Sequence, residues 1–469
     1  MKILLTNSPF QYYMTTSFFH PDWGALNLPQ LAAMVPNHEV KILDNWHHWF
    51  KQERILQTIK EFQPQVLAVS NSTAADTNRV LEMTLQIKRN YPKIIMIIGG
   101  QAATVRYKDC LNSGFSVVIR GEGEYTFQEV VDRINQGSKD FSDIQGVSYL
   151  KEGQFVNSPD RNFIENLDQL PFPRWELMPR FKSNFFPGIF ASVIESSRGC
   201  PYTCDFCAVQ SFWQRRYRKK SNERIIAELE VLKRRLGYDQ VYFIDDSFAL
   251  NVKEYTELFE TMIRKKVTVK GFSQIRPDTV ANNPDMIKLA ARAGFWGFLV
   301  GFDSYDEQAL SEVHKTGGTK INIKAAEILR KNEIGIFGVH MYGMPGTGYR
   351  NFNKTFNLGM ENSDTFRMSR FSLIPGTPLY NELAEKNMVE ARTGKYVPHS
   401  HKIKSEKRKS NMENVMYILY ELRSLIGWKA IKKYITSAGI ARTLQTRAYI
   451  VAIRYVFYLT YRKAGFEIL

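Results

Sequence analysis

The sequence has little cysteine and no long hydrophobic run. Only 4 of its 469 residues are cysteines, too few for a disulfide framework, which favours a reducing, cytoplasmic location. No stretch reaches the roughly eighteen uninterrupted apolar residues that a membrane-spanning helix needs. No repeat period indicates a solenoid or a propeller. With 44% hydrophobic residues, a chain of this length is expected to form two or three globular domains.

Positive charge is concentrated towards the end of the sequence. The formal net charge is +16, and residues 395–469 hold 15 Lys and Arg against 4 Asp and Glu. A basic region there could cap a site, bind an anionic substrate or make peripheral contact with a membrane. Nucleic acid is not favoured as a partner, because no fold that binds it is recognisable and charge alone is not specific.

Residues 1–157 alternate short apolar runs with amphipathic stretches. Runs of continuous apolar residues are typical of a parallel sheet that is buried on both faces. Five such units predict a doubly wound α/β domain of the Rossmann or flavodoxin type, which binds ligands beyond the carboxyl ends of its strands. The expected strands are Lys2–Asn7, Glu39–Asp44, Gln65–Asn71, Lys93–Ile98 and Ser116–Arg120, with helices near 28–35, 51–62, 76–90, 106–113 and 126–135 and a hairpin at 146–157.

A proline-rich linker, residues 158–188, separates this domain from a second α/β series at 189–387. Its six units predict a partial TIM-like (β/α)6 barrel, in which the working residues follow the strands. The expected strands are Ile189–Ser196, Gln240–Ile244, Thr268–Ile275, Phe295–Phe302, Gly335–Tyr342 and Phe366–Leu373, with helices near 222–236, 253–265, 284–293, 321–331 and 349–361. Residues 388–469 are expected to form a helical, basic C-terminal tail.

Three of the four cysteines, Cys200, Cys204 and Cys207, form a C-x3-C-x2-C run after the first strand of the second series. Thiolates this close together bind an iron–sulfur cluster or zinc. A four-iron cluster usually takes four cysteines, so three would leave one iron open to a substrate or cofactor. Structural zinc usually has four ligands, and no fourth cysteine or histidine lies nearby in the sequence. The run favours a cluster; a zinc-binding, non-catalytic module is the alternative from another class.

The cysteine spacing, with Phe206 before the last cysteine, resembles the signature of the radical S-adenosylmethionine (SAM) enzymes. Over residues 1–385 the order of landmarks resembles the cobalamin-binding radical SAM proteins. Those landmarks are Lys41–Asp44, Gly99-Gly100, Arg120–Glu124, the linker Asn166–Pro173 and the cysteine run. The resemblance implies a [4Fe–4S] cluster on Cys200, Cys204 and Cys207, SAM on the open iron, and cobalamin over the strand ends of the first domain.

For cobalamin the resemblance points to residues at the carboxyl ends of the first five strands, where small side chains admit a bulky ligand. These residues are Asn7, Ser70, Ser72, Thr73, Gly99, Gly100, Gln101, Gly121, Glu122, Gly123 and Glu124. The D-x-H-x-x-G loop, whose histidine binds cobalt in many cobalamin domains, is absent from the sequence. His47 and His48 stand at the wrong offset to replace it, so no histidine ligand to cobalt is expected.

For SAM the resemblance points to residues after the strands of the second domain: Phe206, Asp245, Asp246, Arg276, Asp303, Ser304, Gly343 and Ile374. The two aspartates stand where the family contacts the SAM amino group, although aspartate also caps helices well. Arg276 suits the SAM carboxylate, because a guanidinium group matches carboxylate geometry; a surface arginine is the alternative. Asp303 and Ser304 would meet the ribose, and Gly343 and Ile374 either line the adenine or form turns.

By this resemblance the protein is an enzyme. Reductive cleavage of SAM at the cluster would give a 5′-deoxyadenosyl radical, and a methyl group would pass to an unactivated carbon, or to phosphorus, of a biosynthetic substrate. The alternative within the family is an oxidative cyclase of the anaerobic magnesium-protoporphyrin ester cyclase type, which residues Phe212–Arg218 loosely resemble. The expected partners are a small-molecule substrate, such as a lipid or a tetrapyrrole, and an external electron donor such as flavodoxin or ferredoxin. No general acid or base is assigned.

Overall fold

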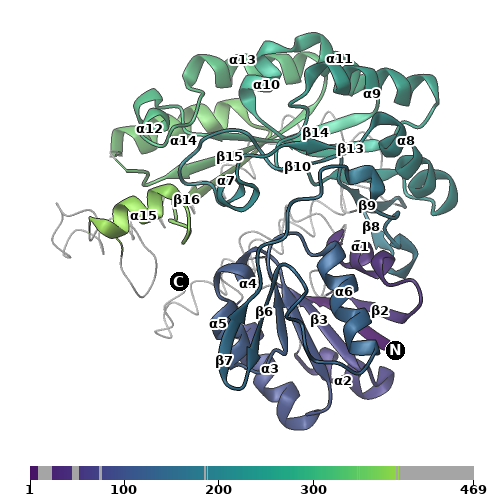
Figure 1. Cartoon of the computed structure of the whole chain (residues 1–469). Coiled ribbons are helices and arrows are strands. Elements are labelled where there is room, and N and C mark those ends of the chain that lie inside the picture. Colours follow the sequence, from purple (N-terminus) through teal and green to yellow (C-terminus); the bar gives the residue numbers. More distant parts are fainter. Residues whose placement is uncertain are drawn as a thin grey trace, which may run out of the picture.

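The computed structural model describes residues 1–8, 24–44, 52–72, 77–183, 186, 188–345, 347, 349–386 and 389. These residues form two α/β domains, one above the other in Figure 1. Apart from Val389 the expected C-terminal tail lies outside the described residues, as do Thr73, His47 and His48. Among the described residues, none of the helices combines the length and the hydropathy needed to span a bilayer.

The first domain is built on a seven-stranded sheet in the order β2-β1-β3-β4-β5-β6-β7. Strands β1 to β5 are parallel, and β6 and β7 form an antiparallel edge. The order 2-1-3-4-5 is that of flavodoxin-like folds, so the doubly wound arrangement is confirmed. The strands are β1 (Lys2–Asn7), β2 (Glu39–Leu43), β3 (Val66–Ser70), β4 (Ile95–Gly99), β5 (Val117–Ile119), β6 (Val147–Lys151) and β7 (Gln154–Asn157).

Helices cover both faces of this sheet, which explains why its strands read as continuous apolar runs. Ile3 and Leu5 of β1 pack in one buried cluster with α1 and α6, whereas Leu4 packs in another with α2, α3 and α5. Successive side chains therefore reach opposite cores, as the period of a strand requires. The helices are α1 (Asn27–Met34), α2 (Gln52–Phe62), α3 (Thr77–Asn90), α4 (Gln101–Val105), α5 (Tyr107–Asn112) and α6 (Glu124–Asn135).

The second domain is a curled, open sheet in the order β16-β15-β14-β13-β12-β9-β8, with helices on its outer face (Figure 1). Six of its strands are parallel, and β8 is antiparallel to β9. This sheet confirms the partial barrel. Its strands are β8 (Phe181–Lys182), β9 (Phe190–Ile194), β12 (Gln240–Phe243), β13 (Lys270–Ile275), β14 (Phe295–Asp303), β15 (Gly335–Tyr342) and β16 (Thr365–Arg370).

The helices of the second domain depart from the expectation at several places. The long helix expected at 222–236 is α8 (Asn222–Glu230) followed by a π-helical turn, Val231–Arg235. Several short helices were not predicted, because five to eight residues carry too weak a periodicity. The other helices are α7 (Ala208–Trp213), α9 (Val252–Arg264), α10 (Pro277–Asn282), α11 (Pro284–Arg292), α12 (Glu307–Ser311), α13 (Thr319–Lys331), α14 (Tyr349–Asn362) and α15 (Pro378–Glu385).

The proline-rich linker is fixed to both domains by side-chain hydrogen bonds. From the first domain, Gln30 Nε2 donates to the Pro171 carbonyl oxygen at 3.1 Å. From the second, Arg224 Nη1 donates to the Leu170 carbonyl oxygen at 2.7 Å. In addition, Trp175 of the linker donates its indole N–H to the carbonyl oxygen of Val193 on β9, at 3.0 Å. Residues 166–175 therefore form a bound strap between the domains.

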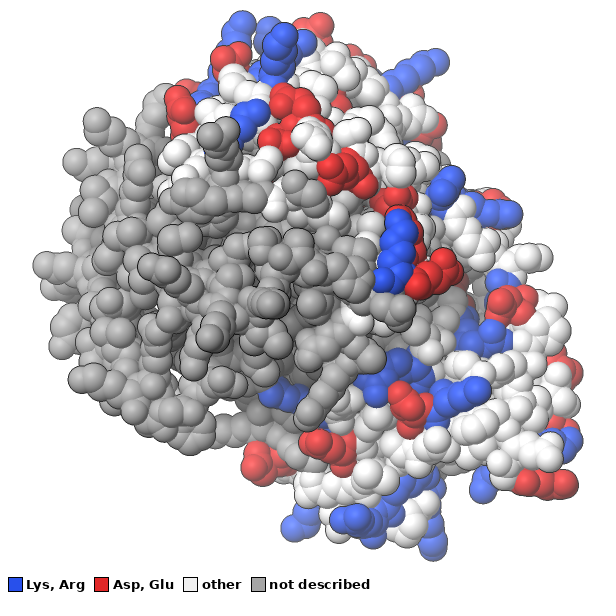
Figure 2. All heavy atoms as spheres, turned by 90° about the vertical axis from the view of Figure 1, so that its left-hand side faces the viewer, with Lys and Arg blue, Asp and Glu red and all other residues white. Residues whose placement is uncertain are grey.

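Side chains of both charges are interspersed on the molecular face drawn in Figure 2. On that face the described residues form no extended patch of a single sign.

A fully buried ion pair anchors the start of α8. Lys220 Nζ lies 2.8 and 2.9 Å from the two carboxylate oxygens of Glu228, which also accept a hydrogen bond from Arg224 Nε at 2.7 Å. The Lys220 and Glu228 side chains are only 2% and 0% exposed. Two charges removed from water in this way stabilise the fold only while both are present.

We therefore expect Glu228→Gln to lower the free energy of unfolding by about 3–5 kcal/mol, because it leaves the Lys220 ammonium buried and uncompensated. Glu230→Gln is the matched control on the same helix. Its carboxylate is 35% exposed and lies 3.5 Å from Arg234 Nη1, and such pairs contribute less than about 1 kcal/mol. Urea denaturation followed by circular dichroism measures both variants, and equal losses would contradict the prediction.

Candidate active site

The three cysteines lie in a loop that is closed by a two-stranded ribbon. Strand β10 (Ser197–Arg198) pairs antiparallel with β11 (Arg218–Lys219), and α7 lies between them in the sequence. Gly199 follows β10 with φ +82°, and a Cβ atom there would lie 1.9 Å from the Arg216 carbonyl oxygen. Only glycine fits at this position, because its neighbour is rigid backbone. The ribbon thus fixes where the run of cysteines begins.

Strand ends of the second sheet surround this cysteine loop. After β12, Asp246 Oδ2 accepts a hydrogen bond from the Gly199 N–H at 2.9 Å. After β13, the Arg276 guanidinium stacks 3.5 Å from the ring centroid of Tyr202. After β16, Phe371 packs on Phe206 with 5.8 Å between ring centroids. The loop therefore sits at the carboxyl edge of the partial barrel, where working residues are expected.

The thiols are largely removed from solvent. Burial raises the pKa of Cys207 to about 11, although the Val209 N–H group acts in the opposite direction. Burial also raises the pKa of Cys200, opposed by the Tyr202 N–H group and by Arg276. Donors aimed at sulfur suit the thiolates of a bound metal centre. Within the described residues no three His, Cys, Asp or Glu side chains converge as a single metal ion requires; a four-iron cluster binds its thiolates on separate irons.

Most of the polar residues expected to bind SAM have partners within the protein. The fully buried Asp245 carboxylate accepts hydrogen bonds from the Ser196 N–H at 2.7 Å, the Ser197 hydroxyl at 2.6 Å and the Tyr255 hydroxyl at 2.8 Å. The contacts assign Asp245 to fixing the segment before the cysteines. Asp246 holds Gly199, as described above, so both aspartates support the cysteine loop.

The remaining residues expected at the SAM site follow β13 to β16. Arg276 donates through Nε and Nη2 to the two carboxylate oxygens of Asp278, at 3.0 and 2.8 Å. Asp303 pairs with Lys315. Ser304 Oγ lies 3.1 Å from Thr355 Oγ1. Gly343 has φ +76° with no atom within 4 Å of a Cβ position, and Ile374 is exposed.

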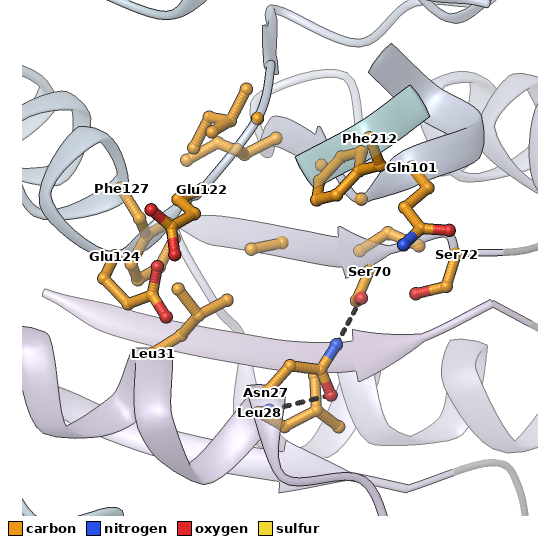
Figure 3. Close-up of a pocket in the computed structure, with 18 of the residues that line it drawn as sticks. Asn27, Leu28, Leu31, Ser70, Ser72, Gln101, Glu122, Glu124, Phe127 and Phe212 are labelled. Carbon is orange, nitrogen blue, oxygen red and sulfur yellow. Dashed lines mark hydrogen bonds between the residues drawn. The ribbon is translucent and has the colours of Figure 1, made fainter. Parts of the chain in front are cut away.

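A cavity of about 240 Å³, partly open to solvent, lies at the carboxyl ends of the strands of the first sheet (Figure 3). All the residues expected to bind cobalamin line it except Asn7 and Thr73. Asn7 is buried instead, where its Nδ2 donates to Asp44 Oδ1 at 2.8 Å. Thr73 lies outside the described residues.

The walls of the cavity combine exposed backbone at the strand ends with apolar side chains. Gly121 has φ +72° and no atom within 4 Å of a Cβ position, so the space beside its backbone is open. Below the strand ends, apolar side chains of β3, β4, β5, α1 and α6 continue the lining, namely Ala68, Ile97, Ile119, Leu31 and Phe127. In Figure 3 Glu122 and Glu124 lie on one side of the cavity, and Phe212 and Gln101 on the other.

A buried cluster of charges joins this cavity to the cysteine loop. Arg198 donates to Glu122 at 2.7 Å, to Glu124 at 2.6 Å and to Glu195 at 2.7 Å. Arg218 donates to the second oxygen of Glu122 at 2.8 Å. Burial acts to raise the pKa of Glu124, but the adjacent Arg198 guanidinium outweighs it, so this pKa lies below its usual range. Burial raises the pKa of Glu195.

Sequence reasoning missed several residues of this region: Glu195, Arg198, Phe212, Trp213 and Arg218. Arg198 and Glu195 lie just before the cysteine run, at the end of a buried strand. A charged residue at such a position is unusual, and this is the signal that could have identified them. Their partners Glu122 and Glu124 were expected to bind cobalamin. Both line the cavity, and both carboxylates also accept hydrogen bonds from Arg198, while the glycines between and before them remain open to the cavity.

Two family models match the chain. Residues 194–359 match the Radical SAM superfamily, and residues 17–131 match the B12 binding domain. The protein is therefore a radical SAM enzyme, with a [4Fe–4S] cluster and SAM among its cofactors. Since a B12 binding domain precedes that domain in one chain, it belongs to the cobalamin-binding radical SAM family, and cobalamin is its third cofactor.

Relatives cover most of the chain. An uncharacterized methyltransferase of Pyrococcus horikoshii is 28% identical over 78% of this chain and 79% of its own length. An anaerobic magnesium-protoporphyrin IX monomethyl ester cyclase of Synechocystis is 25% identical over 71% and 67%, and a hopanoid C-3 methylase of Methylococcus capsulatus 25% over 80% and 71%. The structure of the radical SAM methyltransferase TsrM of Kitasatospora setae matches with a TM-score of 0.66 at 19% identity, over 82% of this chain and 78% of that one, which shows a shared fold.

The expectation that Gly121 lies against cobalamin can be tested by a substitution that adds a methyl side chain at this position. Gly121→Ala should weaken cobalamin binding about tenfold, because an added methyl in a filled site costs about 1–3 kcal/mol. Gly137→Ala is the matched control: Gly137 has φ +77° and the same open space, but does not line the cavity. Titration of cobalamin-free protein, followed by visible absorbance, gives both affinities. Equal affinities would remove Gly121 from the site.

Proposed function

We propose that this protein is a cobalamin-dependent radical SAM methyltransferase that methylates an unactivated carbon, or phosphorus, of a small-molecule substrate. One observation carries the proposal: a single segment, residues 198–213, contains the three cysteines and also lines the cavity of the first domain through Arg198, Phe212 and Trp213. A substrate at that segment would meet the cofactors of both domains. The family places all three cofactors in one chain, and its methyltransferase-named relatives favour methyl transfer.

In this proposal Cys200, Cys204 and Cys207 bind the cluster, and the rest of the loop holds them in place. Asp246 fixes Gly199 from the barrel, and Asp205 is tied at both ends, since its N–H donates to the Val313 carbonyl oxygen at 3.2 Å and its carbonyl oxygen accepts from the Leu379 N–H at 3.1 Å. When bound, the cluster with SAM supplies one-electron cleavage of a carbon–sulfur bond, and cobalamin supplies the methyl group. The protein's own task is placement and exclusion of water.

Arg276 is the residue best placed to recognise the SAM carboxylate. It lies beside the cysteine loop through its stacking on Tyr202, and its charge acts on Cys200. None of the described hydrogen bonds uses its Nη1, whereas Nε and Nη2 are held by Asp278. A guanidinium that is fixed on one edge presents its remaining donor without further loss of side-chain freedom. Asp303, Ser304, Gly343 and Ile374 stay proposed contacts to the nucleoside.

We further propose a lipid or a tetrapyrrole as the substrate and an external one-electron donor, such as flavodoxin or ferredoxin. Support for the substrate comes from relatives named for hopanoid methylation and for a magnesium-protoporphyrin ester. An electron donor is needed because the reductive cleavage consumes an electron. Peripheral membrane contact would suit a lipid substrate.

Oxidative cyclisation is the second candidate, since cyclases of magnesium-protoporphyrin ester are among the relatives. The two candidates differ in the fate of the methyl group. With SAM labelled in its methyl carbon, a methyltransferase puts the label into the product, whereas a cyclase does not. We expect labelled product from anaerobic turnover with candidate lipids and tetrapyrroles; 5′-deoxyadenosine formed with an unlabelled, oxidised product would favour the cyclase.

Removing any one of the three motif cysteines should abolish the cluster. Cys200→Ala, Cys204→Ala and Cys207→Ala are each expected to lose most of the bound iron and sulfide after anaerobic reconstitution, because the loop offers no replacement thiolate. Cys110→Ala is the control, as Cys110 is buried in the core of the first domain. Iron and sulfide assays, with circular dichroism for folding, measure the outcome. Iron content equal to that of Cys110→Ala would refute the ligand assignment.

A further inference from the structure

The two charged residues that close the ribbon of the cysteine loop both reach into the other domain. Arg198 and Arg218 face each other in the register of β10 and β11. Both guanidinium groups donate to Glu122, one to each carboxylate oxygen. The Ile164 N–H donates to the same carboxylate at 2.7 Å, so the linker joins the cluster as well.

This arrangement engages all three nitrogen atoms of the Arg198 guanidinium. Its Nε, Nη1 and Nη2 atoms each bond a different carboxylate: Glu195, Glu122 and Glu124. The side chains of Arg198, Glu122 and Glu124 are 8%, 3% and 9% exposed. A planar guanidinium fixed on three sides cannot rotate, and a lysine could not reproduce that fork. The backbone of β10 is therefore held from the first domain.

Buried charge pairs add little net stability compared with an apolar core, so their value lies more often in a defined geometry. Here the geometry they define is that of the ribbon. Cys200 follows Arg198 by two residues, and the Gly199 between them is locked against Arg216 and Asp246. If the Arg198 side chain moves the backbone of β10, the fixed Gly199 cannot absorb the movement, and the position of Cys200 changes as well.

We propose that Glu122 and Glu124 of the first domain are positioning residues for the iron–sulfur loop of the second, acting through Arg198. The inference rests on the proposed function in one respect, namely that the cysteines bind the cluster. It assigns the pair Glu122 and Glu124 a role beyond lining the cobalamin cavity. The placement of the cluster then depends on a loop whose glycines, Gly121 and Gly123, border that cavity.

The test compares the reduced cluster in wild-type protein, Glu122→Gln, Glu124→Gln and Arg198→Lys, all free of cobalamin. We expect each variant to bind wild-type amounts of iron but to give a broadened, shifted electron paramagnetic resonance signal and a several-fold weaker response to SAM. A role confined to stability would lower the melting temperature without altering the signal of the loaded, folded protein. Glu124→Gln removes the charge from only one ion pair with Arg198, so it reports even where Glu122→Gln fails to fold.

Glu129→Gln is the matched control. Glu129 lies on α6 of the same domain, and its carboxylate, which is 45% exposed, pairs with Arg161 rather than with Arg198. The electron paramagnetic resonance spectrum of Glu129→Gln should equal that of the wild type. Folded Glu124→Gln and Arg198→Lys proteins whose cluster signals and SAM responses match the wild type would overturn the positioning role and leave the proposed function standing. A wild-type protein that takes up no iron after reconstitution would overturn both.

Discussion

The desolvated charges around Arg198 constrain the whole molecule. An arginine that is removed from water must meet its carboxylates at hydrogen-bond distance, since an unpaired buried charge is far more costly than a lost contact. Glu122 precedes α6 of the first domain and Glu124 begins that helix, whereas Arg198 lies on the ribbon of the second domain. The pairs can all form in only one relative placement of the domains. In that placement Arg198, Phe212 and Trp213, from the segment that contains the cysteines, line the cavity at the first sheet.

Much of the fold was readable from the sequence because its strands are buried on both faces. Residues such as Ile3, Leu4 and Leu5 are apolar without interruption, since each neighbour in the strand faces a different helical layer. The ribbon and α7 were not readable. Two-residue strands carry no period, and their pairing follows from Gly199 fitting under the Arg216 carbonyl group, a contact between positions far apart in the sequence.

The site was predictable to the extent that its chemistry is local. Three cysteines within eight positions indicate a metal centre, and small residues at strand ends indicate that a bulky ligand binds there. Asp245 shows what the sequence alone does not reveal. Its position after β12 suggests a ligand contact, but the hydroxyl groups of Ser197 and Tyr255 turn its carboxylate inwards. Which side chains face a ligand is decided by partners that are distant in the sequence, as with Glu122 and Arg198.

The bound strap between the domains has a consequence for how large molecules come and go. Gln30, Arg224 and Trp175 fasten residues 166–175 to both bodies. A clamshell motion would have to break those bonds together with the charge cluster, so a hinge at this linker is strongly disfavoured. Cobalamin must then enter through the side of the cavity that is open to solvent, without an opening of the two domains. The residues that line this cavity therefore decide which bulky molecules can enter.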